Sequence, residues 1–285
     1  MKVASIGSHY GEEPPLSGTK GSGAIFFSGC NLRCVYCQNY QISNEEVPAR
    51  IASQSDAGGR GTRYDESELA DELLKLQERG CHNINLVSPT HVANQVIKVL
   101  VLAKEKGLKI PIVYNTNGSD AVSVLRSFEG LVDIYLPDIK YSDDEMAYKY
   151  SGVKNYVEKN REAIKEMFRQ VGNLAVDVAG IAKKGMVVRH LVLPNGIAGS
   201  YESLKFLASL SKDIWLSIMA QYHPCYKAKE YPDLDRRINS AEYEQVLDWV
   251  EELGFKNVLA QELESSEVYL PDFKAQVTFK EQAAI

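Results

Sequence analysis

Short runs of apolar, strand-forming residues alternate with helical patterns along most of this chain. Strands separated by helices predict a parallel sheet with crossover connections. Such a sheet is either open and doubly wound or closed, fully or partly, into a barrel. Both forms place an active site at the carboxyl ends of the strands. The expected strands cover residues 24–28, 83–87, 110–115, 134–137, 187–193 and 214–220, with a weaker one at 257–259.

Capping residues and glycines mark the ends of the helices between these strands. Asp65, with Glu68 three positions later, forms a capping-box pattern, and Gly80 follows as the end of that helix. Gly107 and Gly254 are expected to end two further helices. The further helices are expected at 92–106, 155–169 and 241–253.

The bulk composition excludes several classes of protein. The chain has 285 residues, of which 45% are hydrophobic and 25% charged, as in a folded enzyme with a substantial core. A net charge of −6 disfavours a nucleic acid partner. No apolar run is long enough to span a membrane and the start lacks a secretion signal, so a cytoplasmic location is expected. We expect one domain over 1–285, with its core at about 21–260 and a tail at 262–285.

Three of the five cysteines, Cys30, Cys34 and Cys37, lie close together directly after the first expected strand. An odd number of cysteines without an export signal favours metal binding over disulfides. The spacing Cys-x3-Cys-x2-Cys suits a cubane iron–sulfur cluster, which is usually held by four thiolates. Three local ligands leave one iron free to bind a small molecule.

A structural zinc site and three buried structural thiols are the alternative interpretations of this motif. Zinc normally takes a fourth Cys or His at a paired spacing, and no second pair follows here. Cys81 and Cys225 are isolated, although each has a histidine nearby, His82 and His223, which leaves a composite zinc site open. Thiols that only fill a core are less expected in a loop at a strand end.

The segment 28–39, which contains the three cysteines, resembles the radical S-adenosylmethionine (SAM) superfamily. In that superfamily this spacing holds a [4Fe–4S] cluster, whose unique iron binds the amino and carboxylate groups of SAM. An aromatic residue typically precedes the third cysteine, and Tyr36 fills that position. The resemblance therefore implies one [4Fe–4S] cluster, SAM as a second cofactor, and an α/β fold that is a partial (β/α)6 TIM-like barrel of parallel strands. SAM and the cluster are expected at the strand carboxyl ends.

Within the superfamily, residues 21–226 look most like the activating enzymes of pyruvate formate-lyase and their uncharacterised relatives. The family has an Asp-Thr-Asn-Gly segment after its third strand, and Asn115 replaces the first Asp of that segment here. Its Asp-x-Lys after the fourth strand is matched by Asp138 and Lys140. Its Gly-Gly-Glu segment is replaced by Ser-Pro-Thr-His at 88–91, which makes the SAM pocket a variant.

The resemblance also implies which residues contact SAM. Lys140 should neutralise the SAM carboxylate. Ser88 and Thr90 offer hydroxyls to the SAM ammonium group in place of the missing glutamate. The full expected set is Tyr36, Ser88, Thr90, Asn115, Asn117, Asp138, Lys140, Arg189 and His223.

The resemblance implies a chemistry and partners. SAM is reductively cleaved to methionine and a 5′-deoxyadenosyl radical, which abstracts hydrogen from a glycyl-radical enzyme or a peptide. A small metabolite or another macromolecule is the alternative substrate. A different class of function, an iron–sulfur electron carrier or a metal-held binding module, would turn over no SAM. The electron is expected from a low-potential flavodoxin or ferredoxin, because the cysteine count leaves no second cluster.

Three further segments are expected near the site. The long loop at 38–64, with its glycine-rich stretch at 57–61, is a candidate lid. Cys225 follows a strand, where a hydrogen-donor or thiyl role competes with the more common role of a packed or exposed thiol. The tail at 262–285 is expected to pack across the barrel, with contact to a partner as the alternative.

Overall fold

The computed structural model describes residues 1–43, 61–263 and 271–273. Within these residues, nine strands follow one another across a single sheet, and a tenth, β7 (Ala175–Val176), pairs with β8. All neighbours from β10 to β2 are parallel. The order is β10 (Asn257–Ala260), β9 (Trp215–Met219), β8 (Ala182–Leu191), β6 (Ile134–Pro137), β5 (Ile112–Thr116), β4 (Ile84–Val87), β2 (Ser22–Phe27), β1 (Lys2–His9) and β3 (Thr62–Arg63).

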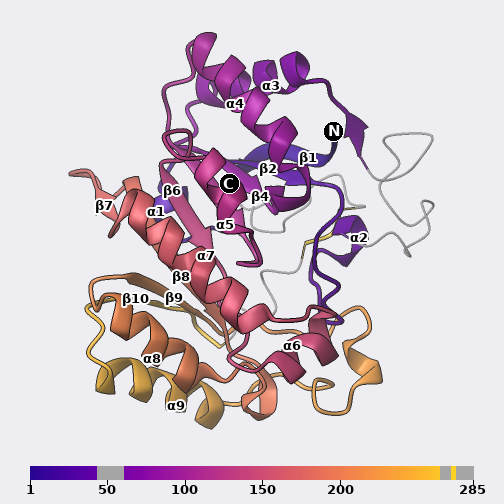
Figure 1. The fold of residues 1–285 in the computed structure, drawn as a ribbon, viewed down its shortest axis with the longest axis vertical. Helices are drawn as coiled ribbons and strands as arrows, with labels where there is room; N and C mark the ends of the chain where they lie inside the picture. The colour runs from indigo at the N-terminus through magenta and orange to yellow at the C-terminus, as the bar shows by residue number, and fades with distance from the viewer. Residues whose placement is uncertain (44–60, 264–270, 274–285) are drawn as a thin grey trace.

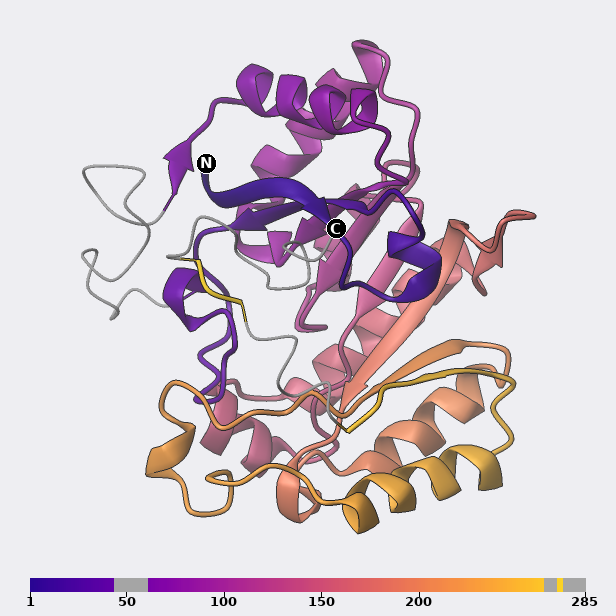
Figure 2. The same ribbon diagram turned by 180° about the vertical axis from the view of Figure 1, so that it is seen from behind.

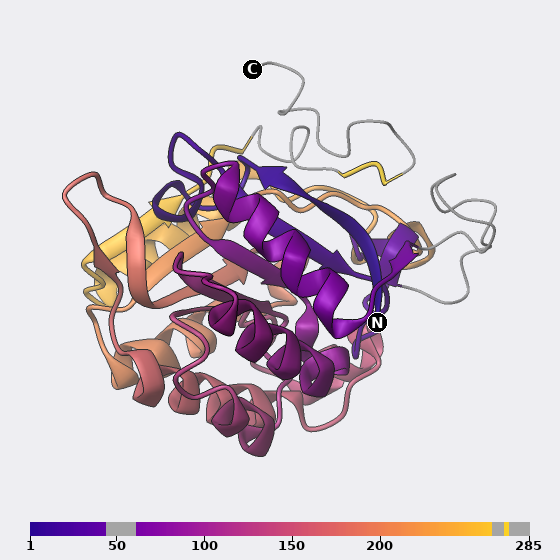
Figure 3. The same ribbon diagram turned by 90° about the horizontal axis from the view of Figure 1, so that it is seen from above.

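The parallel strands confirm the predicted α/β architecture. All six expected strands and the weaker seventh are present, and the expected strand at 134–137 coincides with β6. The sheet is curved but not closed in the described part of the chain, since β10 and β3 remain as its two edges (Figure 3). The fold is therefore a partial barrel.

Strand β1 departs from the parallel pattern, and the sequence does not predict it. It pairs antiparallel with β2, and β3 extends the same edge. Its serines, glycine and lysine are weak strand formers, so pairing with β2 rather than local preference holds it in place. Because β1 runs backwards, His9 lies opposite Ser22 and the next turn falls at the amino ends of the parallel strands.

Helices cover the outer face of the sheet (Figures 1 and 3). Leu73 and Leu100 belong to the same buried cluster as Leu86, which shows how two of these helices pack on the sheet. The outer helices are α3 (Glu66–Glu78), α4 (Ala93–Glu105), α5 (Val122–Ser127), α7 (Tyr156–Val171), α8 (Ser200–Leu210) and α9 (Ser240–Glu252). Shorter elements are α1 (Pro14–Ser17), α2 (Tyr40–Ser43), α6 (Asp144–Ser151), η2 (Pro89–Val92), η3 (Pro194–Gly196) and η4 (Ala228–Glu230).

The predicted capping box is present at the start of α3. Asp65 accepts from the Glu68 amide at 2.8 Å, and the Glu68 carboxylate accepts from the Asp65 amide at 2.9 Å. The same reciprocal pair forms between Asn239 and Glu242 at α9. Helices α5, α6 and α8 are not predicted from the sequence, since their apolar patterns are short and interrupted.

Helix α1 lies at the opposite end of the strands from α2 and the cysteine loop (Figure 2). Its Leu16 is fully buried inside the barrel, where it packs with residues such as Val113, Leu136 and Val187 from three parallel strands. The amino-terminal segment therefore fills the end of the barrel remote from the cysteines, and it carries two glutamates directly before α1.

Two expected segments are only partly described. Residues 44–60 of the candidate lid lie outside the described residues, so this prediction stays open. Of the tail, Phe273 packs edge-to-face on Phe26 of β2, and its amide donates to Gln41 Oε1 at 2.8 Å. No described helix has the length and apolar composition that a membrane span requires.

Candidate active site

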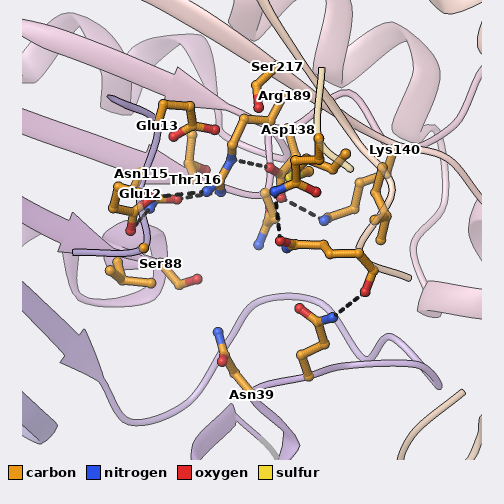
Figure 4. A pocket seen from close by; sticks show the side chains of 18 of the residues that line it. Glu12, Glu13, Asn39, Ser88, Asn115, Thr116, Asp138, Lys140, Arg189 and Ser217 are labelled. Carbon is orange, nitrogen blue, oxygen red and sulfur yellow. Dashed lines mark hydrogen bonds and ion pairs between the residues drawn. The ribbon is translucent and has the colours of Figure 1, made fainter. Parts of the chain in front are cut away.

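A cavity of about 640 Å³ opens at the carboxyl ends of the parallel strands and extends into the barrel. Cys30, Cys34 and Cys37 form part of its wall. The expected SAM-contacting residues in the wall are Tyr36, Ser88, Asn115, Asn117, Asp138, Lys140 and Arg189. Five of them, Ser88, Asn115, Asp138, Lys140 and Arg189, are labelled in Figure 4. Parallel strands deliver these side chains to one place because their carboxyl ends share one edge.

Each cysteine sulfur lies within reach of a hydrogen-bond donor. Asn117 Nδ2 donates to Cys30 Sγ at 3.5 Å, and Ser151 Oγ donates to Cys34 Sγ at 3.0 Å. Ser43 Oγ lies 3.2 Å from Cys37 Sγ. Hydrogen bonds to sulfur are one of the means by which proteins set the potential of an iron–sulfur cluster.

Burial raises the pKa of all three thiols above the ordinary value, and at Cys37 the neighbouring Cys34 adds to the effect. The positive charge of Lys140 acts in the opposite direction on Cys34. Buried sulfurs with donors around them fit a cationic iron–sulfur group, since coordination deprotonates a thiol and the group's charge stabilises the thiolate. The donor set therefore fits the cluster that the motif implies.

Next to the thiols, a chain of ion pairs crosses the cavity wall. Lys140 Nζ lies 2.6 Å from Asp138 Oδ2, and Arg189 Nε lies 2.9 Å from Asp138 Oδ1. Burial opposes the ionisation of Asp138, but Arg189 and Lys140 outweigh it and lower the pKa of Asp138 below its ordinary value. Arg189 also donates to Asn115 Oδ1 at 2.7 Å. These polar groups are thus held in fixed positions before a ligand binds.

Two glutamates that the sequence analysis does not single out complete this network. Glu12 Oε1 accepts from Asn85 Nδ2 at 2.8 Å, and Glu12 Oε2 lies 3.6 Å from Arg189 Nη1. Glu13 lines the same cavity. Burial raises the pKa of both carboxyl groups, and Arg189 partly offsets this. In the sequence these residues precede two prolines and look like an exposed turn; only the antiparallel β1 brings them inside.

Three of the expected residues lie outside the cavity wall. Thr90 Oγ1 donates to Asp120 at 2.7 Å. His223 Nδ1 lies 3.4 Å from Arg237 Nη2. Cys225 Sγ donates to the carbonyl oxygen of Tyr36 at 3.4 Å, and burial raises its pKa to about 11.

Ser88 has a left-handed backbone, with φ of 55°, although it is not glycine. Its amide donates to Asn115 O at 2.8 Å, which ties the ends of β4 and β5 together. Residues in this sparsely populated region cost free energy and gather at functional sites. The backbone at Ser88 therefore has a constrained shape where it meets the cavity.

Tyr36 connects to the thiols through a row of hydroxyl groups. Its OH lies 2.6 Å from Tyr141 OH, which lies 2.7 Å from Ser151 Oγ, the donor to Cys34. Tyr222, next to His223 in the sequence, packs edge-to-face against Tyr36 with 5.8 Å between ring centroids. Tyr36 therefore stabilises the cysteine loop through this row of hydrogen bonds and through its packing on Tyr222.

A parallel partial barrel with three thiols at its strand ends belongs to a class of iron–sulfur enzymes on α/β barrels. More specifically, the chain belongs to the radical SAM superfamily, whose family model matches residues 24–176. Membership supports a SAM-cleaving radical enzyme that uses SAM and an iron–sulfur cluster.

Two relatives extend the match along the chain. An uncharacterized protein of Methanocaldococcus jannaschii is 32% identical over 249 residues, which cover 85% of this chain and 65% of that protein. The chain thus spans about two thirds of that relative's length. The pyruvate formate-lyase-activating enzyme of Clostridium pasteurianum is 27% identical over 197 residues, covering 67% of this chain and 69% of the enzyme. The predicted homology to this class of activating enzyme is confirmed.

Solved structures share the fold at low sequence identity. Methylornithine synthase superposes with a TM-score of 0.54 at 15% identity, over 90% of this chain and 73% of that one. The FeFe-hydrogenase maturase of Carboxydothermus hydrogenoformans gives 0.53 at 13% identity, over 85% of this chain and 54% of the maturase. These similarities support the partial barrel alone.

Proposed function

We propose that this chain holds a [4Fe–4S] cluster on Cys30, Cys34 and Cys37, and binds SAM beside it in the barrel cavity. The observation that carries the proposal is that the three thiols and the ion-pair chain of Asp138, Lys140 and Arg189 line one cavity. A bound cluster would supply the electron that separates the SAM sulfur from its ribose carbon, leaving a 5′-deoxyadenosyl radical.

The chain's own residues bind and orient SAM in this proposal. Burial opposes the charge on Lys140, but the neighbouring Asp138 carboxylate outweighs burial and raises its pKa, so its ammonium stays charged. A fixed ammonium suits the carboxylate of SAM, because a charge-assisted hydrogen bond is stronger than a neutral one. The surrounding barrel and the tail residues at Pro271 limit access of water to the radical.

We propose that the hydrogen comes from a protein or peptide, such as the backbone of a glycyl-radical enzyme. Support comes from the homology to the pyruvate formate-lyase-activating enzyme of Clostridium pasteurianum. The electron would come from a low-potential flavodoxin or ferredoxin.

The test is anaerobic reconstitution with iron and sulfide, reduction with dithionite, and measurement of 5′-deoxyadenosine by mass spectrometry. We expect the product from the wild-type protein and loss of more than about 100-fold in Cys37→Ala, because a missing ligand should cost at least as much as a missing outer-shell partner. Cys81→Ala is the matched control, since Cys81 lies outside the cavity wall and in the buried core. A protein fully loaded with the cubane cluster that forms no 5′-deoxyadenosine contradicts the proposal.

The glycyl-radical part needs its own experiment. The reduced protein is mixed with SAM and a candidate glycyl-radical enzyme, and electron paramagnetic resonance is recorded. A glycyl signal that requires both SAM and this chain supports a protein substrate. SAM cleavage without that signal across the candidate partners of the host points to the small-metabolite alternative.

A further inference from the structure

The ion-pair network of the cavity contains more carboxylates than cations, and its two glutamates lie at the end remote from the cysteines. Glu12, Glu13 and Asp138 are the carboxylates of this network, and Lys140 and Arg189 are its cations. Three carboxylates against two cations leave one negative charge when all five groups are ionised. A buried carboxylate that lacks a counter-charge is unfavourable, and burial accordingly raises the pKa of Glu12 and Glu13. A cationic ligand at this end of the cavity would supply the missing counter-charge and favour the ionised carboxylates.

No further cation comes from the nearby histidine. His9 also lines the cavity close to Glu13, but burial lowers its pKa to about 4, so its ring is neutral near pH 7.

Two buried acceptors at this end also lack hydrogen-bond donors within the described part of the chain. They are Glu13 Oε2 and Asn85 Oδ1. Their neighbouring atoms are engaged, since Asn85 Nδ2 donates to Glu12 and a hydrogen bond from Ser217 favours the charged form of Glu13. Both open positions accept and neither donates. Glu13 lines the cavity whereas Asn85 lies behind its wall, so the open acceptor of Glu13 is the one that suits a ligand with an N–H donor rather than an anion.

The glutamates lie beyond the groups assigned to SAM. The ion-pair chain runs from Lys140, which acts on Cys34, through Asp138 to Arg189, and only then to Glu12. In Figure 4 Glu12 and Glu13 lie across the cavity from Asn39, which follows the cysteine loop. Arg189 and Asn115, which are expected to contact SAM, also contact Glu12, so the glutamates border the expected SAM site on the side away from the cysteines.

The segment that carries the glutamates is rigidly anchored. Glu13 O accepts from the amides of Leu16 and Ser17, two prolines begin α1, and Leu16 is fully buried in the barrel. An anchored segment presents its carboxylates without an ordering cost on binding.

We propose that Glu12 and Glu13 form a substrate subsite that binds a positively charged N–H group, an ammonium or a guanidinium, on the molecule that gives up its hydrogen. This inference rests on the proposed function for its location beside SAM. The cation belongs either to a basic side chain of a peptide or to a free amine, and the experiment below separates the two.

The experiment uses the reconstituted protein with SAM, and saturation-transfer NMR with N-acetyl-lysine methylamide as the probe. Its neutral counterpart is N-acetyl-norleucine methylamide, and butylammonium represents a free amine. We expect the lysine probe to bind and the norleucine compound to fail. Glu13→Gln should weaken the lysine probe at least about tenfold, the effect of a lost charge-assisted contact. Glu202→Gln, on the exposed face of α8, should leave binding unchanged.

The affinities of the lysine probe and of butylammonium distinguish a peptide side chain from a free amine. Tighter binding of the lysine probe than of butylammonium assigns the subsite to a peptide side chain, and equal binding assigns it to a free amine. Either result supports a cationic group. Equal binding of the lysine and norleucine probes overturns the proposal, and so does displacement of the lysine probe by K⁺ or Mg²⁺ alone, which would make this a metal site.

Stability separates a binding glutamate from a structural one. Because Glu13 is buried with an open acceptor, Glu13→Gln should fold with a Tm no lower than that of the wild type, while its probe affinity falls. A marked drop in Tm in both Glu13→Gln and Glu12→Gln contradicts a binding role. Production of 5′-deoxyadenosine by the wild type is measured in parallel. Its absence defeats the proposed function while leaving the probe result interpretable.

Discussion

The two ends of the cavity are built in different ways. At the cysteine end, one continuous loop supplies all three thiols, and each sulfur has a hydroxyl or amide nearby. At the far end, charged groups arrive from three separate elements: the turn before α1 brings Glu12, β8 brings Arg189, and the end of β6 brings Asp138. At the cysteine end every thiol has a hydrogen-bond donor nearby, whereas the far end has an excess of carboxylate.

The two ends of the cavity also differ in how their buried polar groups are stabilised. The thiols tolerate burial because they are neutral until a metal group binds. The two glutamates depend on one guanidinium, that of Arg189, which Glu12 shares with Asp138. The far end therefore depends on a single side chain, while the cysteine end distributes its contacts over several.

The largest effect is expected from removing that shared cation. Arg189→Met leaves the buried carboxylates without their main counter-charge and should lower the free energy of unfolding by about 3–5 kcal/mol, the usual consequence of breaking a buried ion pair on one side. Urea unfolding measures it. Arg169→Met is the matched control, because Arg169 is half exposed on α7 and its pairs should contribute less than about 1 kcal/mol. Equal losses in both variants would remove the contrast between buried and surface networks.

At the cysteine end, a smaller effect is expected from Ser151→Ala. The variant deletes the hydroxyl that donates to Cys34 Sγ and links it to Tyr141. Loss of a group that supports a metal ligand typically costs about 10–100-fold in metal affinity. Iron retained against a chelator, in protein reconstituted under identical conditions, measures the change. Ser209→Ala removes an exposed hydroxyl on α8 and should change nothing; unchanged iron retention in Ser151→Ala would show that this hydroxyl does not support the ligand.

A pH dependence distinguishes the carboxylate end from the thiol end. Burial raises the pKa of Glu12 above its ordinary value of 4.5, so the folded chain holds a proton that the unfolded chain has already released. Stability present below pH 4.5 is therefore lost as the pH rises through the folded-state pKa. Glu12→Gln removes this loss, so the stability of the variant relative to the wild type should rise between pH 4 and pH 8. Urea unfolding at both pH values tests it, and a gain that is the same at pH 4 and pH 8 contradicts it.

The contrast between local and distant contacts also decides what the sequence could predict. The cysteine motif, the strand at 134–137 and the capping box at Asp65 depend on residues a few positions apart, and all three are visible as patterns. The position of Glu12 and Glu13 depends on β1. The sequence of β1 has a weak preference for strand, and β1 forms because it pairs with β2. Two glutamates before two prolines carry no pattern that separates a buried turn from an exposed one.

The residues expected at the site show the same limit. The family resemblance singled out Asn115, Asp138, Lys140 and Arg189, and their positions near the carboxyl ends of parallel strands agreed with it; all four line the cavity. Thr90 lies three residues past the end of β4, and there its hydroxyl faces the buried Asp120, which also accepts from Thr116 and Tyr114. Position after a strand predicts proximity to the site, but side-chain direction depends on such local partners.

The smallest effect on stability is expected at the capping box of α3, which the sequence pattern predicted directly. Asp65→Ala removes one half of the capping box at α3, on the outer face and away from both ends of the cavity. Loss of such a cap should lower the free energy of unfolding by about 1 kcal/mol, since the Glu68 amide loses its acceptor. Thermal and urea unfolding measure the change, and production of 5′-deoxyadenosine by the reconstituted variant should equal that of the wild type. Asp65→Asn, which keeps an acceptor oxygen, should recover most of the loss; a variant as unstable as Asp65→Ala would mean that charge at the helix end, rather than the hydrogen bond, stabilises α3.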